Sequence, residues 1–213
     1  MKAQFPVVCT ANVGASVGAL RRPSASANVI ANVDQRLNTF FDMTYGQGIG
    51  ADSHPAFFLV LSMEDLKSAR HPEPTRSPVS GGSSDFIEKS LKDIALELQP
   101  EIHHLGPHNS LSTLFVVLDG RSLSEEDGLI VQLKDDGELD FARVHFDTIN
   151  AELMRIDVIT DDVAETRELA EKAPGGVLRT EGQEKEKAHE NTRKAPRKKL
   201  ASDPEDRFPD TGT

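Results

Sequence analysis

Residues 112–146, STLFVVLDGRSLSEEDGLIVQLKDDGELDFARVHF, are the stretch that decides the fold class. They contain three strand-like runs, at 112–119, 129–134 and 138–146, of which the last alternates in part between apolar and polar residues. Short apolar runs bounded by turn residues predict buried strands. Between the last two runs, Asp136-Gly137 is a two-residue signal for a hairpin turn. The simplest arrangement of the three strands is therefore an antiparallel meander.

Further elements are predicted on both sides of this meander. Residues 85–99, DFIEKSLKDIALELQ, place apolar side chains at helical spacing, with a capping signal from Asp85 and Glu88. Pro100 is expected to end this helix. Residues 153–160, LMRIDVIT, fit a fourth strand, and the acidic start of 161–172 predicts a closing helix.

The N-terminal part of the chain predicts a second group of elements. Phe5–Thr10 fits a short strand, and residues 27–70 fit a helix–strand–helix segment. Its helices are expected at 27–43 and 62–69, around the apolar run AFFLVLS at 56–62. Residues 71–84, HPEPTRSPVSGGSS, are rich in Pro, Gly and Ser, and this composition predicts a linker or a mobile loop.

We therefore expect an α+β protein. Its antiparallel sheet of three to four strands is covered by two to three helices. The predicted segments are a flexible or targeting arm at 1–26, the helix–strand–helix segment, the linker, an acidic α+β core at 85–173 and a disordered charged tail at 174–213. The tail carries RKAPRKK at 193–199, which fits a solvated segment, a nuclear localisation signal or a segment that docks on an anionic surface.

Charge limits the function classes. The chain has a net charge of −11, and residues 85–172 carry 21 acidic and eight basic side chains. An acidic body repels phosphate backbones, so we expect no nucleic-acid binding by the folded part and a partner protein that is basic. The single cysteine, Cys9, excludes an intramolecular disulfide and fits a cytoplasmic protein. Residues 1–22 lack acidic side chains, so a mitochondrial or plastid transit peptide is the alternative.

No membrane span and no cofactor are predicted. The chain contains no apolar run long enough to cross a bilayer. The glycine-rich segment NVGASVGALRR at 12–22 follows a predicted strand but lacks both the P-loop ending and the dinucleotide-binding spacing. The acidic groups EED at 125–127 and DD at 161–162 fall at predicted turns and helix starts, where solvation and capping explain them.

The histidine-rich stretch EIHHLGPHNS at 101–110 is the main candidate for chemistry. His103, His104 and His108 lie within six positions, and imidazole is both a metal ligand and a general acid/base. His104 and His108 are four residues apart, but Gly106-Pro107 between them prevents the helical face on which such a pair binds zinc. A turn between a helix and a strand, with the imidazoles at the helix C-terminus, explains the same residues.

Three functional hypotheses remain. The leading one is a non-catalytic protein-interaction, assembly or chaperone-like protein. The second is a small metal-dependent or acid/base enzyme that uses His103, His104 and His108, with His104 and His108 as the candidate metal ligands. The third is an organelle-targeted accessory protein. The sequence favours the non-catalytic role and does not specify an oligomeric state.

Overall fold

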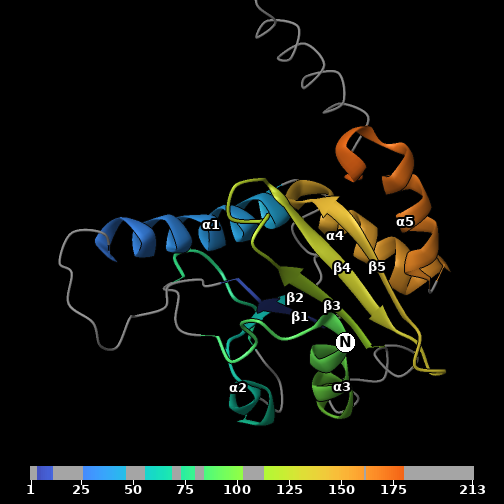
Figure 1. Cartoon of the computed structure of the whole chain (residues 1–213), viewed down its shortest axis with the longest axis horizontal. Helices are drawn as coiled ribbons and strands as arrows, with labels where there is room; N and C mark the ends of the chain where they lie inside the picture. The colour runs from blue at the N-terminus through green and yellow to red at the C-terminus, as the bar shows by residue number, and fades with distance from the viewer. Residues whose placement is uncertain are drawn as a thin grey trace, which may run out of the picture. The chain divides into compact units, whose positions relative to one another are not determined.

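A five-stranded mixed β-sheet forms the centre of the protein in the computed structural model (Figure 1). The structure describes residues 4–11, 26–46, 56–68, 73–79, 84–102, 113–160 and 162–179. The strand order is β2-β1-β3-β4-β5. The strands are β1 (Gln4–Cys9), β2 (Ala56–Val60), β3 (Thr113–Leu118), β4 (Asp127–Leu133) and β5 (Leu139–His145).

The expected sheet of three to four antiparallel strands is wrong in strand number and direction. β3, β4 and β5 form the predicted antiparallel meander, but β1 pairs in parallel with β2 on one side and with β3 on the other. Helix α1 (Ser26–Gly46) lies between β1 and β2 in the chain. Parallel neighbours need such a crossover connection, so the N-terminal segment joins the sheet instead of packing beside it.

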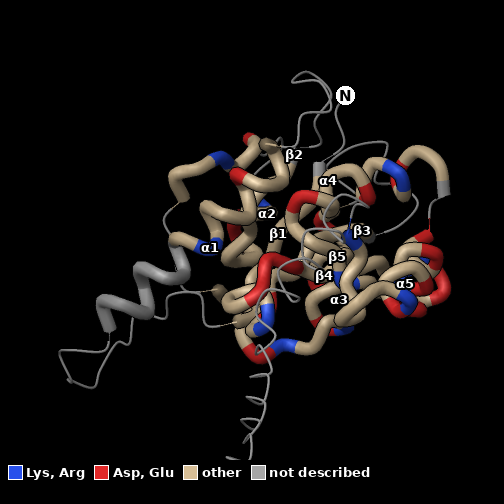
Figure 2. Tube along the Cα trace, turned by 90° about the horizontal axis from the view of Figure 1, so that it is seen from above, with Lys and Arg blue, Asp and Glu red and all other residues tan. Residues whose placement is uncertain are grey.

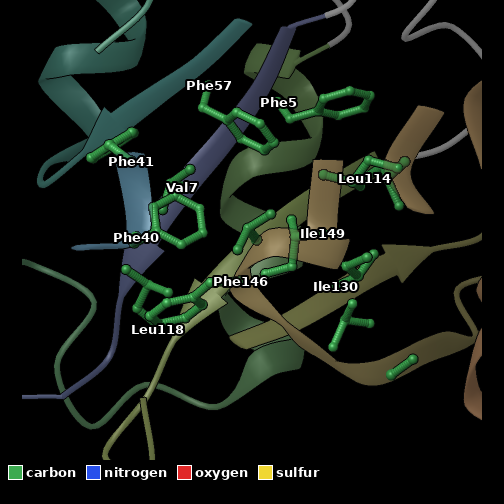
Figure 3. Packing of buried hydrophobic residues seen from close by; sticks show 14 of the residues in the cluster. Phe5, Val7, Phe40, Phe41, Phe57, Leu114, Leu118, Ile130, Phe146 and Ile149 are labelled. Carbon is green, nitrogen blue, oxygen red and sulfur yellow. The ribbon is translucent and has the colours of Figure 1, made fainter. Parts of the chain in front are cut away.

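Helices cover both faces of the sheet. On one face, α1 and α4 (Phe146–Arg155) pack over the first core cluster, which contains Phe40 and Phe57. The ring of Phe40 meets Phe41, Phe57 and Phe146 in edge-to-face contacts with centroids 5.1–5.9 Å apart (Figure 3). This geometry is favourable for aromatic quadrupoles. Eight of the ten phenylalanines are buried, and they supply the aromatic core that the absence of Trp requires.

On the opposite face, α2 (Met63–Ser68) and α3 (Leu91–Ile102) pack over the second core cluster. Helix α3 begins six residues later than expected. Ser90 caps it, because its Oγ accepts a hydrogen bond from the Asp93 N–H, and Glu88 before it has a φ of 63°. Pro100 lies inside the last turn, where the helix continues to Ile102.

The turn between β4 and β5 confirms the hairpin signal and refines its geometry. The loop has three residues, Asp135 to Gly137, and the Lys134 N–H donates to the Glu138 carbonyl across it. The Gly137 N–H donates to the Lys134 carbonyl, and Gly137 has a φ of 81°. A type I turn followed by a left-handed glycine is the common way to close a loop of this length.

The predicted strand at 153–160 is wrong. These residues complete α4 and continue into a π-helical segment, Ile156–Thr160. Ile149, Leu153 and Ile156 are all buried in the first core cluster, and their spacing of four and three residues is that of a helix. The β-branched residues from 156 to 160 produced the strand signal, and the helical stripe overrides it.

The closing helix is confirmed as α5 (Val163–Lys172), with the Asp162 side chain accepting from the Ala164 N–H at its start. A 3₁₀ turn, Pro174–Gly176, follows. The chain then returns to the sheet: the Leu178 N–H donates to the Arg143 carbonyl, and the His145 N–H donates to the Leu178 carbonyl. This pairing occupies the outer edge of β5 at those positions.

The outer edge of β2 is closed by residues 73–79, which are part of the predicted linker. The Thr75 N–H donates to the Phe57 carbonyl, and Thr75 Oγ1 accepts from the Leu59 N–H. Tyr45 Oη bonds both the N–H and the carbonyl of Phe57, and the Asp85 N–H donates to the Leu61 carbonyl. The proposed segment boundaries stay predictions. Of the tail expected to be disordered at 174–213, residues 174–179 form the 3₁₀ turn and the pairing with β5, and residues 180–213 lie outside the described part. Within the described ranges, every helix is too short or too polar to cross a membrane.

Candidate functional site

The histidine hypothesis falls outside the part of the chain that the structure describes. His103, His104 and His108 lie between Ile102, the last residue of α3, and Thr113, the first residue of β3. The same holds for the glycine-rich stretch 12–22, which follows β1 and precedes α1. A metal or acid/base site at these histidines therefore stays a prediction.

The described residues contain a different group of ionisable side chains, at the end of the meander. We call it the ionic cluster and define it as Asp119, Arg121, Glu126, Asp127, Arg143, His145 and Asp147. Asp119 follows β3, Asp127 begins β4, and Arg143 and His145 lie in the last part of β5. The β4–β5 register pairs Asp127 with His145, which brings these strand ends together.

Arg143 is the centre of the cluster. Its Nη1 donates to Asp127 Oδ1 at 2.7 Å, and its guanidinium also forms a close ion pair with Asp119. The side chain is only 15% exposed. Burial alone would lower the pKa of Arg143, but the hydrogen bonds and charges of the two carboxylates outweigh this effect and raise it. Arg143, on β5, is therefore held as a cation between Asp119, which follows β3, and Asp127, which begins β4.

Asp119 organises the loop that leads from β3 to β4. Its Oδ1 accepts from the backbone N–H groups of Arg121 and Ser122, each at 3.1 Å, and from the Ser122 hydroxyl. Burial would raise the pKa of the Asp119 carboxyl, but the hydrogen bonds and charge of Arg143, with those from Ser122, hold it below its usual value. This carboxylate thus joins a turn to the neighbouring strands.

Asp127 is fully buried, and its two oxygens have different surroundings. Oδ1 is hydrogen-bonded to Arg143, whereas Oδ2 lies 3.1 Å from Arg121 Nη2 in an ion pair without hydrogen-bond alignment. Arg121 is 41% exposed and can exchange this contact for water. A buried carboxylate needs a partner that compensates its charge, and Arg143 supplies most of this positive charge to Asp127.

His145 forms the second half of the cluster. Its Nδ1 lies 2.7 Å from Asp147 Oδ1, which also accepts from the Thr148 hydroxyl, and both side chains are buried. Its Nε2 faces Glu126 Oε2 at 3.8 Å. Both ring nitrogens are thus directed at carboxylates, and the imidazole bridges β5 and the start of α4. Among the residues that the structure describes, no group of three or more His, Cys, Asp or Glu side chains converges as a metal site.

The position of the cluster is one where α/β sheets often bind ligands. It lies at the carboxyl end of β3, next to the carboxyl end of β1, where the Thr10 N–H donates to the Leu118 carbonyl. Ligands of open sheets bind outside the carboxyl ends of strands whose connections diverge. Chemically, the cluster can hold three strand ends and α4 in register, and it can present Arg121 and Glu126 to solvent.

Sequence reasoning assigned EED at 125–127 to a solvated turn, and this is wrong for Asp127. Glu125 and Glu126 are exposed, but Asp127 is the first residue of β4 and has no exposed surface. The sequence signal does not recover this contact. Counting outward from a two-residue turn at Asp136-Gly137 pairs Leu129 with Val144, whereas the observed register, set by a three-residue loop, pairs Leu129 with Arg143.

Ion pairing extends to nearly all basic side chains of the acidic region. Seven of the eight Lys and Arg residues between 85 and 172 pair with a carboxylate of the same domain, and Lys92 is the exception within the described part. Arg155, for example, pairs with Glu152 and Glu165. The acidic excess is consequently left to exposed carboxylates.

Comparison with known proteins gives no relative for this chain. No protein-family model, no curated protein and no solved structure matches it.

Proposed function

We propose that the chain is a non-catalytic protein-interaction domain whose acidic body binds a basic segment of another protein. The observation that supports this proposal is the internal pairing of the basic side chains. Because those cations are neutralised inside the domain, the surface presents a surplus of negative charge. Figure 2 shows acidic positions outnumbering basic ones along α5.

The turn between β4 and β5 is the clearest part of this acidic surface. Asp135, Asp136 and Glu138 are exposed and have no basic partner among the described residues. The adjacent Lys134 is drawn back to Asp140 at 2.8 Å and to Asp162 at 3.4 Å. Its charge therefore offsets carboxylates at the base of the turn and leaves the tip negative.

The ionic cluster supports a structural part in the same proposal. Arg143 and His145 are each held between two carboxylates, and these contacts fix the ends of β3, β4 and β5. A rigid body that carries a fixed pattern of surface charge favours complementary partners and steers their approach. This is the role that we assign to the domain.

A selection with peptides of random sequence tests the proposal. The full chain is immobilised and exposed to a display library of short random peptides, at low ionic strength and at about 0.15 M salt, where the Debye length is about 8 Å. We expect Lys- and Arg-rich peptides to be enriched and to bind more weakly as salt rises. Enrichment of no basic class, or binding that is independent of salt, would contradict the proposed function.

A further inference from the structure

Two neighbouring aliphatic side chains, Val158 and Ile159, are exposed to an unusual degree. They are 69% and 76% exposed, more than any other large apolar side chain in the described ranges. Single exposed aliphatic residues are ordinary on protein surfaces, but two adjacent ones of this exposure form a continuous apolar contact area. Ile156, two residues earlier, is fully buried and anchors the segment to the first core cluster.

The position of Val158 and Ile159 in the backbone does not let them stabilise the fold. Val158 and Ile159 belong to the π-helical segment Ile156–Thr160, at the end of α4. π-helical turns are rare and occur frequently at functional sites. β-branched residues also lose side-chain freedom in a helix, and exposed ones recover nothing through packing. Their presence at these positions is therefore not explained by the stability of the domain.

The apolar pair is connected through Asp162 to the base of the acidic β4–β5 turn. Ile159 is three residues from Asp162, which corresponds to at most about 11 Å between Cα atoms. Asp162 Oδ1 in turn lies 3.4 Å from Lys134 Nζ, at the base of the turn. Figure 1 shows the turn and the start of α5 at the same end of the sheet.

We infer that Val158 and Ile159, together with Asp135, Asp136 and Glu138, form a docking surface for a basic amphipathic segment of a partner protein. The apolar pair would contact one or two apolar side chains of that segment, and the three carboxylates would meet flanking Lys or Arg side chains. This inference rests on the proposed function and adds the place where the partner binds.

Charge selects this occupant over two others. A second copy of the chain docked through the same surface would bring identical carboxylates together, and like charges across an interface oppose association. An anionic lipid surface would be repelled for the same reason, although exposed Val and Ile could otherwise insert into it. A cationic protein segment with apolar side chains is complementary to both features.

The test uses a labelled basic peptide from the library selection and the full chain. Val158→Ser/Ile159→Ser should weaken binding about tenfold to a hundredfold, the loss expected for two aliphatic contacts. Leu169→Ser, at another exposed apolar position on α5, is the matched control and should change Kd by less than about twofold. Asp135→Asn/Asp136→Asn/Glu138→Gln should weaken binding and reduce its salt dependence.

A second measurement does not depend on variants. Amide hydrogen exchange of the wild-type chain should slow at residues 134–138 and 156–160 when the peptide binds. Two results would show that the docking surface is wrong while the proposed function stands. In both, the peptide binds with salt dependence, but either the Val158/Ile159 variant keeps wild-type affinity or exchange slows at residues other than these. If no basic peptide binds the wild-type chain, both are overturned.

Discussion

Arg143→Met is the substitution that tests the ionic cluster most directly. Methionine keeps an unbranched apolar stem, but it is shorter than arginine and lacks the guanidinium. Asp127, which is fully buried, would lose its hydrogen-bonded partner, and Asp119 would lose the charge that compensates its partial burial. The variant therefore leaves two carboxylates without their main cation.

The expected cost follows from the burial of the two acids. Removing one member of a buried ion pair typically destabilises a protein by about 3–5 kcal/mol. Arg121 still lies 3.1 Å from Asp127 Oδ2, and Asp119 can gain water, so we expect a value near the lower limit, about 3 kcal/mol. For a domain of this size, the melting temperature should fall by about 6–12 °C.

Chemical denaturation followed by far-ultraviolet circular dichroism measures this change. Lys172→Met is the matched control, because it removes one positive charge from the exposed pair with Glu168. Such a pair contributes less than about 0.5 kcal/mol. If Arg143→Met and Lys172→Met destabilise the protein equally, the ionic cluster does not hold the strand ends together. Arg143→Met/Asp127→Leu should regain part of the loss, because it removes the uncompensated carboxylate.

The pH dependence provides an independent check. The pKa of Asp119 is lowered in the folded protein, so its stabilising effect is fully present above the unfolded value of about 3.9. This effect is lost as pH falls through the lower folded pKa. The stability difference between wild type and Arg143→Met should therefore shrink as the pH falls, and most of it should be lost below about pH 4. A difference that grows on acidification would refute the assignment.

Three further outcomes are expected. Gly137→Ala should cost about 1–2 kcal/mol through its positive φ, whereas Gly120→Ala, with open space and no such φ, should be neutral in the same denaturation assay; equal effects would contradict the turn geometry. Phe86→Ala should cost about 3–5 kcal/mol because the ring is fully buried, and Phe141→Ala, at 45% exposure, less than about 1 kcal/mol. The Cys9 thiol, whose pKa is raised to about 12 by burial, should resist alkylation at pH 8 in the native protein and react on unfolding; rapid native labelling would be inconsistent with its burial.

The sequence predicted those elements whose signals are local. β3 is a continuous apolar run, β5 alternates in part, and the glycine of Asp136-Gly137 has the positive φ of a turn. The start of α3 was missed because two capping signals of the same spacing lie five residues apart. Phe86 is buried in the core while residues 85–88 form a non-helical turn, so the helix begins later, where Ser90 accepts from the Asp93 N–H. That choice depends on tertiary packing, which the local pattern does not contain.

The mixed sheet and the ionic cluster depend on long-range pairing. Whether β1 pairs with β2, with β3 or with both is decided by contacts between residues far apart in the chain, such as Val7 with Leu59 and with Val116. Asp119, Asp127 and Arg143 look like separate charges at turns or within a strand until the register is known. The Asp127–Arg143 relation was also missed, because the two-residue turn expected at Asp136-Gly137 shifts the hairpin register by one residue from the observed one.

Residues 73–79 protect the edge of the sheet from pairing with another chain, which their Pro-rich composition does not suggest. β2 is an apolar strand at the margin of the sheet, and its free amide and carbonyl groups would be a template for pairing with another chain. Thr75 uses one backbone and one side-chain group to occupy that margin. A proteolytic cut in this Pro-rich segment, between α2 and α3, would interrupt none of the described helices, yet it could free the edge of β2 for pairing with another chain. The contacts of Thr75 therefore block the addition of a further strand at Phe57 and Leu59.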